Sequence, residues 1–170
     1  LAPPRYEGAQ EAAARSIVDA ALRQSADAAT LAALIMRRLR DAKQGDEAGY
    51  LLGPEPGNSR LVATAVGLLQ TAGVQARIVN GLILVPERRD ARFVRWLEYH
   101  AEGRWRPLYP AEPTAEALRY YIPWWRGPGA FIQVTGGAGV SHSLTISRSY
   151  ELAVRAALSQ QRELERKLIE

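Results

Sequence analysis

Apolar positions in residues 1–40 recur at the three- and four-residue spacing of a helix. The spacing predicts one helix over residues 9–24 and a second that begins after Ser25 and Asp27. We expect the two helices to pack as an antiparallel pair. The positions that carry the pattern are Ala13, Ile17, Ala20 and Ala21 in the first helix and Leu31, Leu34, Ile35 and Leu39 in the second.

Glycine and proline then punctuate residues 45–57, which predicts a loop with a short extended piece at residues 50–52. A third helix follows over residues 58–72, and Gly73 stands where a C-terminal glycine commonly ends a helix. Apolar residues occupy nearly the whole circumference of this third helix. That distribution is typical of a buried, central helix.

The rest of the chain alternates between β-branched runs and turns. The pattern predicts an α+β domain in which the central buried helix packs on an antiparallel sheet, with two N-terminal helices and a C-terminal helix. We expect residues 1–170 to form one domain, cut from a longer protein. The predicted strands are residues 74–85, 93–100, 105–109, 130–135 and 140–147, with turns at 86–90 and 101–104 and a last helix from 149 to about 170.

The composition of the chain excludes several kinds of catalytic and metal site. The chain has no cysteine and two histidines, which excludes thiol catalysis and thiolate metal sites, and we predict neither a metal nor a cofactor. The 22 basic residues are arginine except for Lys43 and Lys167, but they are scattered along the chain rather than gathered. We therefore expect no nucleic-acid binding. No apolar run approaches the roughly 20 residues that cross a bilayer.

Three segments in the middle of the chain resemble the transglutaminase-like core of the papain-type superfamily. The helix over residues 58–72 and the segment Ala72-Gly73-Val74-Gln75-Ala76-Arg77 resemble the family's nucleophile helix and its "AGIPAR" strand entry. Residues 95–98 are similar to its "HAWVE" strand, and residues 103–110 to its "GW…DPT" strand.

This chain departs from the family pattern at the catalytic triad. The family's cysteine aligns with Asn58 or Ser59, its histidine with Val94, and its aspartate with Tyr109. A serine hydroxyl at a helix N-terminus needs an adjacent base, and Val94 cannot supply one. His100 lies six residues further along the predicted strand, about 20 Å away, whereas a general base must lie about 3 Å from its proton donor. We therefore predict an inactive enzyme.

An enzymatic alternative is a hydrolase that uses Ser59 as nucleophile and His142 as base. Two simpler interpretations stand beside it. A lone histidine in an alternating strand is usually a surface residue, and Asn58 or Ser59 is a good N-cap for the helix that follows. Another alternative for the whole chain is a membrane-associated oligomerisation module built on the last predicted helix, residues 149–170.

One family fits this combination of features more closely. The degenerate triad, the two preceding helices and the segment at residues 147–153 resemble the inactive transglutaminase domain that bacteria fuse to a seven-helix membrane bundle. The resemblance implies a periplasmic domain of an inner-membrane protein, attached to the membrane by segments absent from this chain. It implies a sensor or a module that binds a peptide or protein, possible associates being a retropepsin-like protease and an ATP-grasp ligase.

Two places in the sequence are candidates for binding. Trp96 and Tyr109 are expected beside the relic of the catalytic cleft, although ordinary core packing is the favoured interpretation of Trp96. The aromatic stretch at residues 120–125 is followed by Arg126, and tryptophan, tyrosine and arginine are the residue types richest in interface energy. Trp124, Trp125 and Arg126 are thus predicted either to bind a partner or to plug one end of the sheet.

Overall fold

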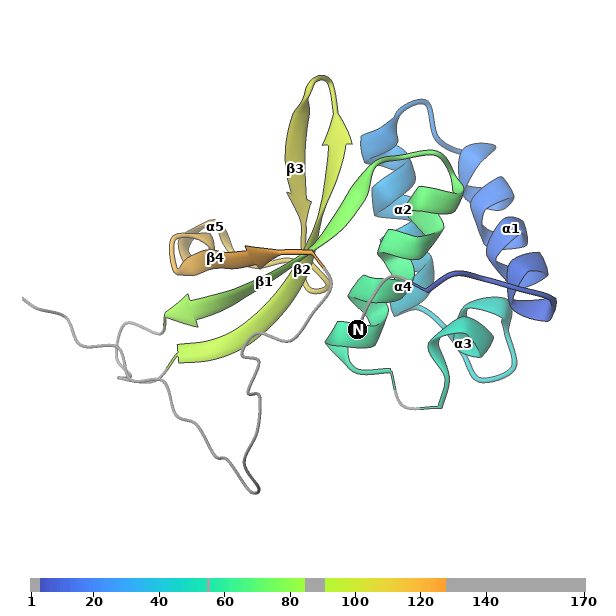
Figure 1. The fold of residues 1–170 in the computed structure, drawn as a ribbon, viewed down its shortest axis with the longest axis horizontal. Helices are drawn as coiled ribbons and strands as arrows, with labels where there is room; N and C mark the ends of the chain where they lie inside the picture. The colour runs from blue at the N-terminus through green and yellow to red at the C-terminus, as the bar shows by residue number, and fades with distance from the viewer. Residues whose placement is uncertain (1–3, 55, 85–90, 128–170) are drawn as a thin grey trace, which may run out of the picture.

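A helical layer and an antiparallel sheet lie side by side in this chain (Figure 1). The computed structural model describes residues 4–54, 56–84 and 91–127, and within them the fold is α+β, as predicted. In chain order the elements are α1 (Ala9–Leu22), α2 (Ala28–Arg40), α3 (Glu47–Leu52), α4 (Asn58–Thr71), β1 (Ala76–Leu84), β2 (Ala91–Ala101), β3 (Arg104–Leu108), α5 (Ala115–Leu118) and β4 (Tyr121–Arg126).

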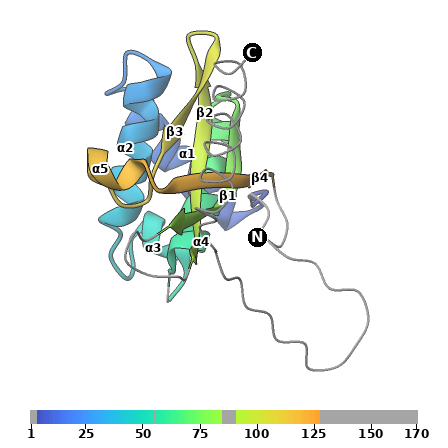
Figure 2. The same cartoon turned by 90° about the vertical axis from the view of Figure 1, so that its left-hand side faces the viewer.

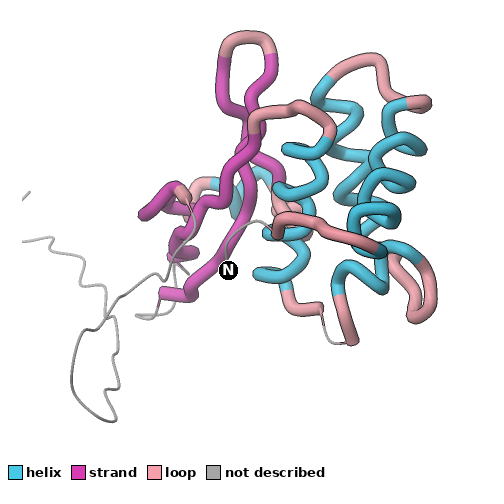
Figure 3. Tube along the Cα trace, turned by 45° about the vertical axis from the view of Figure 1, so that its right-hand side comes forward, coloured by secondary structure: helices cyan, strands magenta, loops and turns pink. Residues whose placement is uncertain are grey.

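The two predicted N-terminal helices are present as α1 and α2. Asp27 caps α2 by accepting a 2.7 Å hydrogen bond from the backbone N–H of Thr30, which explains why the helix begins there. Ile17 of α1 and Ile35 and Met36 of α2 are buried, and both helices pack against α4. The helices α1 to α4 thus lie together on one side of the strands (Figure 3).

The extended piece predicted at residues 50–52 is wrong, because these residues belong to the short helix α3. Asp46 caps α3, and its carboxylate accepts a 2.6 Å hydrogen bond from the N–H of Gly49. Ala48, Leu51 and Leu52 form the buried face of this helix. Gly49 is one of the glycines that suggested a loop. It is needed within this helix because a Cβ at that position would lie 2.1 Å from the carbonyl oxygen of Lys43.

The predicted central helix is α4, which is buried on every side from Leu61 to Leu69. It ends as expected at Gly73, whose φ of 79° suits glycine, and the N–H of Val74 bonds to the carbonyl of Leu69 at 2.9 Å. Its beginning differs from the prediction. Gly57 is the N-cap and has no capping side chain, so Asn58 and Ser59 lie inside the first turn and neither caps the helix.

The sheet has the strand order β3-β2-β1-β4, with all neighbours antiparallel, and α4 packs against β1 and β2. The predicted hairpin between β2 and β3 is confirmed. Its turn consists of Glu102 and Gly103, whose φ angles of 52° and 75° fit the type I′ turn that matches strand twist. The strands predicted at 130–135 and 140–147, the helix predicted at 149–170 and the turn at 86–90 lie outside the described residues.

Candidate functional site

A hollow of about 290 Å³ lies at the N-terminus of α4. It brings together residues that are far apart in the sequence: the first turn of α4, the facing parts of β1 and β2, the segment after β3, and the start of β4. Asn58, Ser59 and Val94, three of the four residues at the triad positions, are among them. The lining residues are Asn58, Ser59, Asn80, Ile83, Phe93, Val94, Arg95, Pro110, Ala111 and Tyr121.

The helix contributes backbone polarity to this hollow. An α-helix leaves its first N–H groups without intrahelical partners, and those groups carry the positive end of the helix dipole. In α4 the N-cap has no side chain to accept from them, because residue 57 is glycine. Asn58 and Ser59, both exposed, therefore present a positive end to the hollow.

A cross-strand polar pair lines the opposite wall. Asn80 and Arg95 are register partners on β1 and β2, and the Nε of Arg95 donates a 2.7 Å hydrogen bond to Oδ1 of Asn80. Asn80 is 3% exposed and its Nδ2 donates to the carbonyl of Gly127 at 3.2 Å. Burial lowers the pKa of the Arg95 guanidinium, which nevertheless keeps its charge at neutral pH.

The structure also shows which side of β2 carries this pair. Side chains alternate along a strand, so Arg95 shares its side with Leu97 and Tyr99, and both of these belong to the core beneath the helices. Val94 shares the other side with Trp96. Both Val94 and Arg95 line the hollow. Its charged group belongs to Arg95, one residue after the position that aligns with the family's histidine.

Tyr109, at the aspartate position, belongs to an aromatic cluster. Its ring centroid lies 5.8 Å from that of Trp96 and 5.0 Å from that of Tyr121, and Trp96 and Tyr121 are 5.8 Å apart. Burial raises the pKa of the Tyr109 phenol, with smaller contributions from Tyr121 and Glu98. Trp96 is 3% exposed and presents little surface to a partner. Tyr121 of this cluster also lines the hollow, so the cluster supports one of its walls.

Nothing in the described part of the hollow suits hydrolysis. Ser59 lines it, but the residues around it include neither a histidine nor a carboxylate to act as base. His100 packs against Trp105 at 5.5 Å between ring centroids, near the turn between β2 and β3. His142 lies outside the described residues, so the hydrolase alternative with Ser59 stays a prediction.

The aromatic stretch forms β4, an outer strand of the described sheet. Trp124 and Trp125 are 59% and 55% exposed, so these two indoles do not fill the interior of the described sheet. Tyr121, by contrast, packs on Trp96. Arg126 donates to the buried carboxylate of Glu98 at 3.1 Å, as does Arg77 at 2.8 Å.

The sequence prediction missed Asn80 and Arg95. The signal available was an asparagine inside a β-branched run, at Ile78-Val79-Asn80, where a polar side chain needs a partner to be buried. The partner was hidden because cross-strand register does not appear in a local pattern. The wall of the hollow can be recognised only when Asn80 and Arg95 are known to face each other on adjacent strands.

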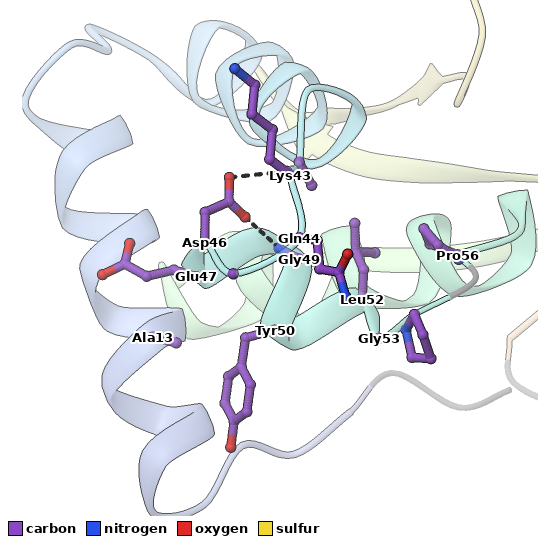
Figure 4. A pocket seen from close by; sticks show the side chains of 13 residues that line it. Ala13, Lys43, Gln44, Asp46, Glu47, Gly49, Tyr50, Leu52, Gly53 and Pro56 are labelled. Carbon is purple, nitrogen blue, oxygen red and sulfur yellow. Dashed lines mark hydrogen bonds between the residues drawn. The ribbon is translucent and has the colours of Figure 1, made fainter.

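A second, larger hollow of about 760 Å³ lies around α3 and the loops on either side of it (Figure 4). Asp46 turns back onto the backbone of Lys43 and Gly49, so its carboxylate is already engaged in holding the loop. Tyr50 and Lys43 point in different directions (Figure 4). Its polar groups do not converge on one point, and we assign it no function.

Among the described residues, His, Cys, Asp and Glu side chains nowhere gather in threes that could hold a metal ion. None of the helices in residues 4–54, 56–84 and 91–127 has the length and apolar character needed to traverse a bilayer.

Comparison with known proteins matches residues 1–55 to a family described as inactive transglutaminase fused to 7 transmembrane helices. The match confirms the expected family resemblance over this stretch. It covers α1, α2 and α3 and stops before α4, so the segments that resemble the catalytic core lie beyond it. No curated protein and no solved structure matches the chain.

Proposed function

We propose that this chain is a catalytically inactive transglutaminase-like domain that binds an extended peptide or protein segment through a carboxylate. In this proposal it acts as the extracytoplasmic, periplasmic sensor or binding module of a membrane protein. The family matched by residues 1–55 supports the membrane setting and the loss of activity, because its description names both an inactive enzyme and seven transmembrane helices.

The hollow at the N-terminus of α4 carries the proposal. Its helix side presents the positive end of α4 at Asn58 and Ser59, and its sheet side presents the guanidinium of Arg95, which Asn80 fixes in place. A carboxylate between them would accept hydrogen bonds from backbone N–H groups and pair with a cation. Two positive walls around a small hollow favour an anion over a neutral ligand.

Binding without cleavage follows from the same residues. In a working cysteine or serine enzyme the nucleophile and base lie within hydrogen-bond reach of each other. Among the described lining residues, Ser59 has neighbours that can hold a ligand but none that can remove its proton. The family resemblance makes a retropepsin-like protease and an ATP-grasp ligase the first protein partners to test.

A direct test uses fluorescence anisotropy with two labelled alanine peptides, one ending in a free carboxylate and one in an amide. We expect the chain to bind the acid form and to bind the amide at least about tenfold more weakly. Equal affinity for the two peptides, or no binding of either, would overturn the proposal.

The variant for this test is Asn58→Asp, which adds a negative charge to the hollow without touching the core. An acidic residue in the first turn favours the helix, so the variant should fold at least as stably as the native chain while binding of the acid peptide falls. Arg95→Gln should also weaken binding. Arg92→Gln, an exposed arginine on the same strand, is the matched control and should bind normally.

A further inference from the structure

Strand β4 and the short helix α5 carry an exposed apolar patch, which we call the β4 patch. It consists of Leu118, Ile122, Trp124 and Trp125, which are 40%, 39%, 59% and 55% exposed. Figure 1 shows β4 and α5 on the side of the sheet away from α1, and Figure 2, which faces that side, shows β4 crossing in front. The β4 patch thus lies apart from the hollow's helix wall.

A break in strand register sets the two tryptophans together. Asn80 pairs with Trp125 and Gly81 pairs with Pro123, so Trp124 is the extra residue of a β-bulge. In a regular strand two consecutive side chains point to opposite faces, whereas a bulge re-aims a side chain and bends the strand. Here the result is that two adjacent indoles are both more than half exposed.

The charge around these indoles is net positive. Residues 115–127 contain Arg119 and Arg126 and one acidic residue, Glu116. Arg126 does bond to Glu98, but its side chain is 45% exposed, and Arg77 shares the same carboxylate. Glu98 is thus shared between two arginines. The guanidinium of Arg77 lies over the ring of Trp105 on β3, so Arg119 and Arg126 are the arginines of the β4 side.

We propose that the β4 patch rests on the surface of a bilayer that contains anionic lipids. Tryptophan, like tyrosine, is enriched at membrane–water interfaces, where its amphipathic ring lies at the level of the headgroups. Arginines beside it are attracted to anionic headgroups. The inference rests on the membrane setting of the proposed function, and two adjacent exposed indoles beside Arg119 and Arg126 are what favours an anionic lipid surface over a protein surface.

The contact orients the domain. A bilayer beneath β4 and α5 leaves the helical layer, α1 to α3, pointing away from the membrane (Figure 1). The hollow and the β4 patch meet on β4, because Tyr121 lines the hollow and the next residue, Ile122, belongs to the patch.

Sedimentation with vesicles tests this contact. The native chain is mixed with vesicles of phosphatidylcholine alone and with vesicles that also contain phosphatidylglycerol. We expect it to bind the anionic vesicles and to dissociate from them as salt is added. The double variant Trp124→Ala/Trp125→Ala should partition at least about tenfold more weakly, and Arg119→Gln should weaken binding to anionic vesicles only.

Trp105→Ala is the matched control, because Trp105 is a 37% exposed tryptophan on β3, at the other edge of the described sheet. It should bind vesicles like the native chain. Circular dichroism of each variant verifies that it is folded. Absence of vesicle binding, unchanged binding of the folded double variant, or self-association lost in that variant without vesicle binding would each overturn the proposal. Vesicle binding with no discrimination between the acid and amide peptides would reject only the proposed function.

Discussion

Arg95 and Asn80 face each other directly across β2 and β1, and the Nε of Arg95 donates to Oδ1 of Asn80 at 2.7 Å. The amide of Asn80 continues the connection by donating to the carbonyl of Gly127, which follows β4. One buried asparagine therefore ties β1 and β2 to the end of β4. It also fixes the only cation among the described residues that line the hollow.

Replacement of Asn80 by alanine should destabilise the chain by about 1–3 kcal/mol, because it removes a buried side chain that accepts from Arg95 and donates to the carbonyl of Gly127. Urea unfolding measures the change. Gln24→Ala is the control, since Gln24 makes an exposed hydrogen bond and its loss should change stability by less than about 0.5 kcal/mol. Equal effects of the two substitutions would contradict the importance given to Asn80.

Gly81→Ala should be one of the most damaging single substitutions in the sheet. A Cβ at this position would lie 2.4 Å from the Trp96 ring and 2.4 Å from the carbonyl oxygen of Ile122. Because a backbone atom is one of the obstacles, rotation of Trp96 cannot relieve the overlap, and we expect a loss of about 3 kcal/mol.

The matched control for this glycine is Gly57→Ala, where an added Cβ meets nothing within 4 Å and φ is −72°. Its effect on the free energy of unfolding should stay within about 0.5 kcal/mol. A Gly81→Ala chain as stable as Gly57→Ala would show that β1 and β4 are not as close as described.

Asp46 should give part of its stabilisation a pH dependence. The N–H of Gly49 is the largest cause that holds the pKa of this carboxyl below its ordinary value, with the N–H of Lys43 and the Arg38 guanidinium acting in the same direction. A lowered folded pKa means that the stabilisation is present above the unfolded pKa, about 4, and is lost as the pH falls through the folded value.

The comparison is with Asp46→Asn, which keeps the capping oxygen but not the charge. At pH 7 the native chain should be more stable by about 0.5 kcal/mol, since Asp46 and Arg38 are partly exposed and solvent screens them. The difference should shrink between pH 4 and pH 2 in urea unfolding experiments. A difference that stays constant across this range would refute the assignment.

Glu98→Gln should destabilise the sheet by about 1–2 kcal/mol, because the side chain is 11% exposed and is bonded to both Arg77 and Arg126. Exposure of the two arginines reduces the cost, since each can turn to water. Glu11→Gln, which breaks an exposed pair with Arg15 in α1, should cost at most about 0.5 kcal/mol. Chemical denaturation of both variants tests the difference.

The helices were the most predictable part of this fold. Helical spacing identified α1, α2 and α4 because each buries a continuous face, and Gly73 ended α4 where the sequence indicated. The short helix α3 was missed because Gly49 and Gly53 count as loop residues in a local pattern. Gly49 is needed because a Cβ there would lie 2.1 Å from the carbonyl oxygen of Lys43, and Gly53 because it ends the helix at a φ of 79°.

The strand β4 was harder to predict. Pro123 argues against a strand because proline has no backbone N–H to donate. In the described sheet, β4 pairs with β1 alone, and Pro123 lies next to the break in their register. The candidate site was half predictable for a related reason. Alignment with the family placed Asn58, Ser59 and Val94, which do line one hollow, but Asn80 and Arg95 were found only when the register of β1 and β2 was known.

The most direct test of the central proposal maps the binding site by NMR. The backbone amides of the chain are followed while the alanine peptide with a free carboxylate is added, and the peptide is checked for cleavage by mass spectrometry. We predict shifts at Asn58, Ser59, Asn80 and Arg95, and a peptide that stays intact. Shifts confined to the hollow around α3, no shifts at all, or a cleaved peptide would contradict the account of a carboxylate-binding, inactive domain.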